Sequence, residues 1–167
     1  MKTYTVSSVM AAKPCSQYSE ERVASLWAGR ESLTAREISD LEIPIVDRIW
    51  GLIRVCMDAR TQRLFGCDCA ERALMRESEA GREPDARSWN AISVSRRFAY
   101  GSATSEELDA AWDAASAAVW NVARDAASAA ACAAASAAAC AAARDAARDA
   151  ERAWQLAHAL EMIEAQP

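Results

Sequence analysis

Alanine dominates the C-terminal part of this chain and restricts what that part can fold into. Between Ala110 and Ala159 there are 27 alanines in 50 residues, and neither glycine nor proline occurs between Gly101 and Pro167. Alanine is the best helix former because ordering it costs no side-chain entropy. A methyl group buries little surface, so such a helix gains little from ordinary core packing and instead allows another helix to approach closely. The sequence therefore predicts one or two very long helices that pack tightly against a neighbouring surface.

The first 100 residues carry the helix-start and helix-stop signals that the alanine-rich part lacks. Thr34 and Glu37 have the spacing of a capping box, as do Thr104 and Glu107, and Pro44 suits a first helical turn. The first 15 residues indicate an irregular or short extended arm, and no β-alternating run of useful length follows. The expected helices run from Ser16 or Ser19 to Gly29, from Thr34 to about Leu41, from Pro44 to Met57, from Asp58 or Thr61 to Gly81, from Pro84 to Gly101, and from about Ser105 onward.

These patterns predict an all-α fold, with several short N-terminal helices packed against one or two long alanine-rich C-terminal helices. We expect a single helical domain over residues 1–167, made of a short-helix bundle at 16–101 and a long helix at 105–163. An unbroken helix over 105–163 would extend about 90 Å, whereas a domain of this length has a radius of gyration of about 15 Å. Either the helix bends or breaks, or it protrudes and pairs with a second copy of the chain.

Charge is distributed unevenly along the chain. The formal net charge is −5, with 15 basic and 14 acidic side chains in residues 1–100 and 4 basic and 10 acidic in residues 101–167. Direct binding of nucleic acid is disfavoured, because contacts to phosphates need clustered lysine or arginine. The acidic C-terminal part could attract a basic protein surface, or its carboxylates could only keep an alanine-rich protein in solution.

Cysteine usage and hydropathy favour a cytoplasmic protein. The N-terminal residues lack the unbroken apolar core of a signal peptide, and the six cysteines are expected to be small buried apolar side chains in a reducing compartment. Residues 126–143 carry no charge, but they contain no Leu, Ile, Val or Phe, and charged pairs lie on both sides. We therefore expect no membrane span.

Few residues offer catalytic or metal chemistry. His158 is the only histidine, and Cys67 and Cys69 are two thiols where structural zinc needs four ligands. The five glycines form no phosphate-binding loop. We expect a protein that is not an enzyme, with no catalytic residue, no metal and no cofactor.

Carboxylates on the long helix are the candidate partner-binding residues. On an ideal straight helix, four of these aspartates would project within roughly 40° of one another. A rigid array of this kind could engage a basic partner or mimic a phosphate backbone. The candidate acidic face comprises Glu106, Glu107, Asp109, Asp113, Asp145 and Asp149.

An ordered set of short motifs over about residues 40–165 resembles a known protein family. The motifs are Ile45-Val-Asp-Arg-Ile-Trp50, Asp68-Cys-Ala-Glu-Arg-Ala-Leu74, Pro84-Asp-Ala-Arg-Ser88, Ala99-Tyr-Gly101 and Glu107-Leu-Asp-Ala-Ala-Trp112, followed by the alanine tract. This set is similar to a diffuse family of alanine-rich helical proteins of phages, prophages and bacterial genomes, some of which are described as immunity proteins. The resemblance implies a helical fold and a mobile-element setting, and it implies no catalytic residues.

Three hypotheses for the function follow. The leading one is a non-enzymatic inhibitor from a phage or mobile element that binds and neutralises a host defence complex, as anti-CRISPR proteins do. The second is an immunity protein that binds a cognate toxin. The third is a structural protein whose alanine-rich helix mediates assembly, for example as a homodimer. All three have a protein partner.

Overall fold

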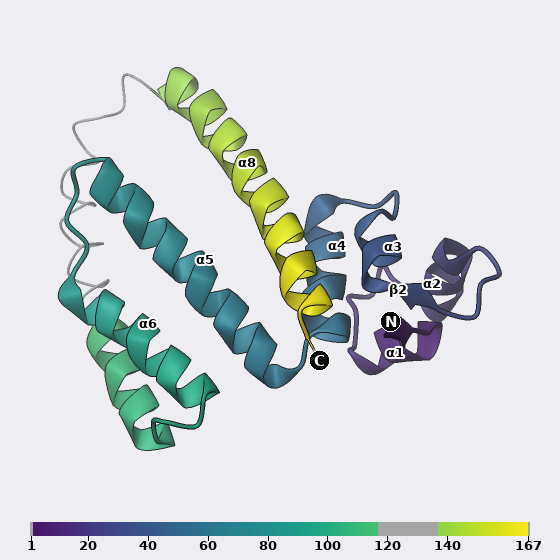
Figure 1. Cartoon of the computed structure of the whole chain (residues 1–167). Helices are drawn as coiled ribbons and strands as arrows, with labels where there is room; N and C mark the ends of the chain where they lie inside the picture. The colour runs from purple at the N-terminus through teal and green to yellow at the C-terminus, as the bar shows by residue number, and fades with distance from the viewer. Residues whose placement is uncertain (1, 117–136, 167) are drawn as a thin grey trace. The chain divides into compact units, whose positions relative to one another are not determined.

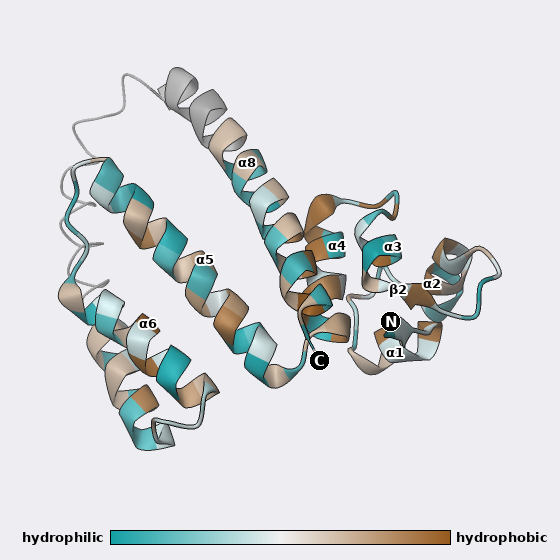
Figure 2. Cartoon of the chain, viewed as in Figure 1, coloured by the Kyte–Doolittle hydropathy of each residue, from teal (hydrophilic) through white to brown (hydrophobic). Residues whose placement is uncertain are grey.

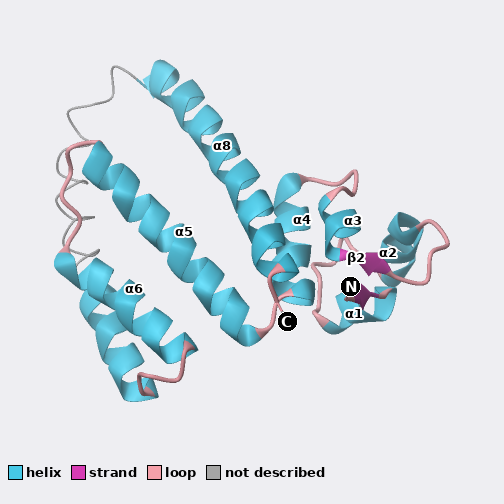
Figure 3. Cartoon of the chain, in the orientation of Figure 1, coloured by secondary structure: helices cyan, strands magenta, loops and turns pink. Residues whose placement is uncertain are grey.

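Helices make up most of the chain (Figure 3). The computed structural model describes residues 2–116 and 137–166, and for residues 137–145 it describes the backbone alone. Within these residues the strands amount to one antiparallel pair, β1 (Thr3–Tyr4) with β2 (Leu33–Thr34). The predicted all-α class is confirmed.

Contacts within the chain separate it into two compact units. The first unit comprises Met1–Gln62 together with Arg148–Pro167, and the second comprises Arg63–Ala147. Helix α5 (Ala59–Glu79) begins in the first unit and continues in the second, whereas α8 (Ala137–Glu164) begins in the second and ends in the first (Figure 1).

The N-terminal arm is more regular than the sequence predicts. Helix α1 (Val6–Ala11) follows β1, and Thr5 and Ser8 form a reciprocal cap at its start. The expectation of an irregular or extended arm is therefore wrong for these six residues. Tertiary burial explains the difference: Tyr4 is 3% exposed, and its hydroxyl donates a hydrogen bond to the carbonyl oxygen of Cys56 at 3.1 Å. This bond anchors the chain two residues before the helix, so a short segment without strong propensity becomes ordered.

Helices α2 (Glu20–Trp27) and α3 (Ala35–Ser39) begin at caps that the sequence indicates. Of the two serines proposed for α2, Ser19 is the N-cap. Thr34 caps α3 and Glu37 completes the predicted capping box, because its carboxylate accepts the backbone N–H of Thr34 at 2.8 Å. Both predicted helices are confirmed.

The third predicted helix is present, but its geometry changes along its length. Helix α4 (Ile45–Gly51) starts directly after Pro44 and passes into a π-helical turn, η1 (Leu52–Cys56). The N–H of Met57 closes this turn by donating to the carbonyl oxygen of Leu52 at 3.1 Å. The wider turn places Leu52 and Cys56, each 0% exposed, in the core.

The core of the first unit combines all of these short elements. Figure 2 shows hydrophobic residues on α2 and α4. The indole of Trp27 is 3% exposed, and its Nε1–H donates to the carbonyl oxygen of Tyr4 at 3.2 Å, which joins α2 to β1. The largest fully buried side chains are those of Val23, Leu33, Leu52 and Cys56.

The end of α8 belongs to this unit as well. Ala159, Leu160 and Ile163 are buried, and the guanidinium of Arg36 on α3 binds the carboxylate of Glu164 at 2.8 Å. Apolar side chains one helical turn apart therefore hold the last two turns of α8 in the unit.

In the second unit, α5 and α6 (Ala86–Ala99) are joined by a central ion-pair cluster. Arg96 on α6 donates to Asp68 at 2.6 Å and to Glu71 at 2.5 Å, both on α5. A further helix begins at residue 105, as predicted. Among the side chains of this unit that the structure describes, the buried apolar ones are those of Phe65, Cys67, Ile92, Val94 and Ala111.

The predicted long helix over 105–163 is described at its two ends, as residues 105–116 and as α8. Its continuity, and any bend or break in it, fall mainly on residues 117–136, which lie outside the described residues. None of the helices described combines the length and the apolar character that a membrane span needs.

Candidate functional site

An apolar pocket opens in the first unit between α1, α2, α3 and α4. Its volume is about 310 Å³, at the lower end of the range typical of ligand-binding cavities. Val46 on its lip is 44% exposed. The wall is mainly aliphatic and aromatic, and it includes Val9, Leu26, Trp27, Leu41, Val46 and Trp50.

The helix periodicities explain why these side chains converge. On α4, Val46 and Trp50 lie four residues apart, so both project from one side of the helix. On α2, Val23 and Trp27 share a side in the same way and are buried, while Leu26 lies at the edge of that side and is only half-buried. Each helix therefore contributes side chains both to the buried core and to the wall of an open recess.

One polar pair interrupts the apolar wall. The hydroxyl of Tyr18 donates a hydrogen bond to Oδ2 of Asp47 at 2.7 Å. Burial of the phenol and its bond to this carboxylate raise the pKa of Tyr18 to about 12. The guanidinium of Arg22 lies over the Tyr18 ring, 4.5 Å from its centroid. The pair fixes one side of the pocket, and Asp47 is part of its wall.

This arrangement suits binding. An apolar recess with a single carboxylate can hold an apolar group by desolvation and orient it by one charged contact. Burial of a leucine-sized or phenylalanine-sized group contributes about 1.5–3 kcal/mol, enough for an anchor within a larger interface.

The predicted acidic face is described in part. Glu106, Glu107, Asp109 and Asp113 lie on the helix from residue 105 and are exposed. Glu107 is engaged locally, because its carboxylate accepts the N–H of Thr104 at 2.8 Å and lies 3.3 Å from Arg97. These four residues therefore share one exposed helix, and Glu107 belongs to its cap.

The other two residues of the acidic face belong to different parts of the structure. Asp149 is exposed in the first unit, 3.6 Å from Arg152. The side chain of Asp145 lies outside the described residues. The alignment of the four aspartates on one straight helix stays a prediction, since residues 117–136 separate the two groups.

The predicted burial of the cysteine side chains is confirmed only in part. Cys56 and Cys67 are buried, and burial raises the pKa of the Cys56 thiol to about 12. Cys15, in contrast, is exposed and lines the apolar pocket, so the expectation of burial is wrong for it. It follows Pro14 in an irregular segment between α1 and α2, where no helix face covers the side chain. Cys132 and Cys140 lie outside the described side chains.

His158 takes part in an aromatic contact on α8. Its ring stacks on Trp154 with centroids 4.8 Å apart, and Nδ1 lies 3.7 Å from the carboxylate of Glu161. Across the described residues, no three His, Cys, Asp or Glu side chains come together as a metal-binding group.

Comparison with protein-family models, with curated proteins and with solved structures finds no match to this chain. The assignment of the candidate site therefore rests on the geometry of the pocket.

The sequence pattern does not reveal the pocket. The helical spacing of Ile45, Ile49 and Trp50 indicates a buried face, but it does not separate residues that fill the core from residues that line a recess. Tyr18 and Asp47 lie 29 positions apart, and neither has a local signal. A tyrosine just before an N-cap serine and an aspartate in the first turn of α4 are each ordinary on their own.

The Tyr18–Asp47 bond makes a prediction that NMR can test. In Asp47→Asn the negative charge that disfavours the phenolate is lost, so the pKa of Tyr18 should fall from about 12. It should stay above the ordinary value of 10.0, because burial is the larger cause of the shift. The measurement is the pH titration of the Tyr18 ring-carbon resonance. Tyr4 is the internal control, since burial and Cys56 raise its pKa to about 12. An unchanged Tyr18 titration would show that the bond is absent in solution.

Proposed function

We propose that this chain is a non-enzymatic protein-binding inhibitor, encoded by a phage or another mobile element, that neutralises a host defence complex as anti-CRISPR proteins do. The observation that carries a binding role is the open apolar pocket of about 310 Å³ in the first unit. Interfaces depend on a few anchor side chains that enter such recesses, with weaker contacts around them.

Binding free energies indicate how the pocket would contribute to a complex. One buried anchor supplies about 1.5–3 kcal/mol, whereas a micromolar to nanomolar complex needs about 8–12 kcal/mol. The pocket is therefore the proposed anchor point of a larger interface. The net charge of −5 favours a partner with a basic surface, and the resemblance to phage and prophage proteins supports the mobile-element setting.

The test uses the full chain in bacteria with an active CRISPR–Cas system. Its expression should restore plaque formation by a phage that the system normally excludes, and the tagged chain should retain a subunit of the effector complex. Val46→Lys places a charge at the pocket lip and should abolish both effects. Ala24→Lys, at an exposed α2 position that does not line the pocket, is the matched control.

The other outcomes contradict the proposal in distinct ways. Continued exclusion of the phage, with no effector subunit retained, would remove the inhibitor function. If the chain instead rescues cells from a co-expressed toxin, it is an immunity protein. Inhibition that survives Val46→Lys would separate the function from the pocket.

A further inference from the structure

An acidic surface adjoins the apolar pocket. A second hollow shares Leu26 and Leu41 with the pocket, and its remaining wall includes Glu37, Asp40 and Glu42. We call the surface formed by Asp40 and Glu42 the acidic shelf. The two shared leucines make the apolar pocket and the shelf neighbouring parts of one surface of the first unit.

The shelf keeps its negative charge because the nearby cation is already paired. Arg30 binds Glu37 with a distance of 3.0 Å between Nη1 and Oε1. The backbone and hydroxyl of Thr34 also donate to Glu37, and these bonds together with Arg30 lower the pKa of its carboxyl. The charges of Arg30 and Glu37 cancel, whereas Asp40 and Glu42 are both exposed and leave the shelf negative.

Tyr18 lines the pocket but not the second hollow. Around Tyr18 the guanidinium of Arg22 lies over the ring and the carboxylate of Asp47 accepts the hydrogen bond of the hydroxyl, so one cation and one anion offset each other there. The unbalanced negative charge lies instead on the acidic shelf, beside Leu26 and Leu41.

We propose that the pocket and the acidic shelf together bind a partner segment with one large apolar side chain followed or preceded, within a few residues, by lysine or arginine. The apolar side chain enters the pocket between Trp50 and Leu26, and the cation lies on the shelf near Glu42. This inference rests on the proposed protein-binding function and specifies the chemistry of the partner.

Selection from a random displayed peptide library against the full chain tests the proposal without knowledge of the natural partner. The enriched peptides should contain Leu, Met, Phe or Trp with a lysine or arginine nearby. One enriched peptide, labelled with a fluorophore, is then titrated by anisotropy against the chain and its variants.

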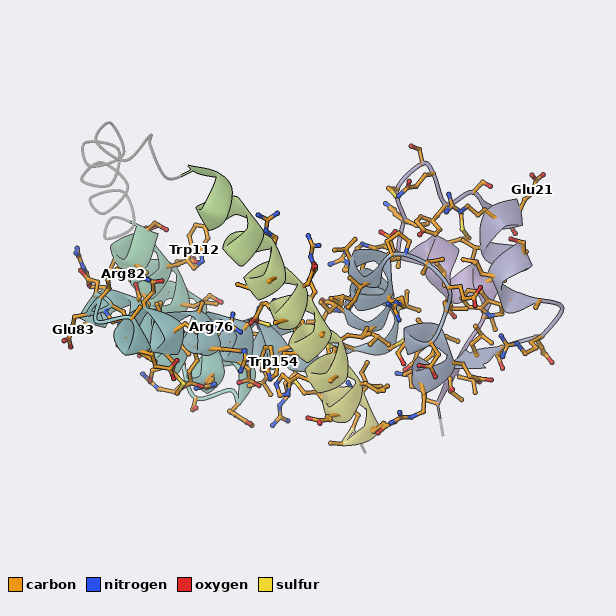
Figure 4. The ribbon with its side chains drawn as sticks, turned by 90° about the horizontal axis from the view of Figure 1, so that it is seen from above. Glu21, Arg76, Arg82, Glu83, Trp112 and Trp154 are labelled. Carbon is orange, nitrogen blue, oxygen red and sulfur yellow. The ribbon has the colours of Figure 1, made fainter. Side chains whose placement is uncertain are left out.

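Matched variants assign the two parts of the surface. Val46→Ser should weaken binding about tenfold, because it removes apolar contact at the pocket lip. Glu42→Lys should weaken binding about fivefold at low salt, and the difference should shrink at high salt. Glu21→Lys is the control for the charge change, since Glu21 projects outward from α2 (Figure 4) and lines neither hollow. It should leave binding unchanged.

Three results would overturn the proposal. They are the enrichment of no peptide, the enrichment of peptides without a paired apolar and basic residue, and equal effects of Glu42→Lys and Glu21→Lys. Failure of the proposed inhibitor function would look different from failure of this inference. In that case peptides with a paired apolar and basic residue would still bind the chain, but the chain would not restore plaque formation by the phage.

Discussion

Replacement of Trp27 by alanine is expected to lower the free energy of unfolding of the first unit by about 3–5 kcal/mol. The indole is 3% exposed, so its removal opens a large cavity among helices that cannot collapse onto it. The substitution also deprives the carbonyl oxygen of Tyr4 of its donor at 3.2 Å, which adds to the cost. Small domains are stable by about 5–15 kcal/mol, so the loss is a large share of the total.

Urea denaturation followed by far-ultraviolet circular dichroism measures this effect. Trp112→Ala is the matched control, because the same side chain at residue 112 is 68% exposed and projects from its helix (Figure 4). Its effect should stay within about 0.5 kcal/mol. Equal effects of the two substitutions would mean that Trp27 does not lie in a packed core.

Elements with both a start and a stop signal could be predicted from the sequence. Ser19 and the pair Thr34 and Glu37 begin helices where the sequence indicates, because their side chains satisfy backbone groups locally. Pro44 lies directly before α4 without a side-chain capping bond, and its fixed φ favours the start of a helix. Helix α1 could not be predicted in this way. Its order depends on the contact of Tyr4 with Cys56, 52 positions away, and a local pattern holds no information about that contact.

The candidate site was less predictable than the fold. Carboxylates are easily recognised in a sequence, so the sequence predicts an acidic face on the long helix. The alignment of its aspartates requires that the helix be continuous through residues 117–136. The pocket instead uses residues that look like ordinary core, such as Leu26 and Trp50, from segments that meet only in the folded unit. Whether an apolar residue fills a core or lines a recess is decided by packing between helices, which periodicity does not report.

Arg96→Gln is expected to destabilise the second unit by about 2 kcal/mol at neutral pH. The guanidinium bridges α6 to two carboxylates of α5, with distances of 2.6 Å to Asp68 and 2.5 Å to Glu71, and all three side chains are about one-third exposed, at 29–32%. Without the guanidinium, the carboxylates of Asp68 and Glu71, which lie about one helical turn apart on α5, lose the cation that they share. Glutamine keeps a donor but not the charge.

The sign of the pH dependence separates this electrostatic effect from lost packing. The hydrogen bond from Arg96 holds the pKa of Glu71 below its ordinary value of 4.5. A carboxyl group whose pKa is lowered in the folded state stabilises that state fully at pH values above its ordinary pKa. It loses this contribution as the pH falls through the lowered pKa. The difference in unfolding free energy between the wild type and Arg96→Gln should therefore be constant from neutral pH down to about 4.5 and then shrink.

Denaturation across this pH range provides the measurement, and Arg82→Gln provides the control. Arg82 also pairs with a carboxylate, that of Glu77, but its side chain is 63% exposed. Exposed ion pairs contribute little, so this variant should match the wild type at every pH. A loss for Arg96→Gln that persists unchanged in acid would mean that the arginine stabilises the unit through its aliphatic stem, and that the carboxylates of α5 do not depend on its charge.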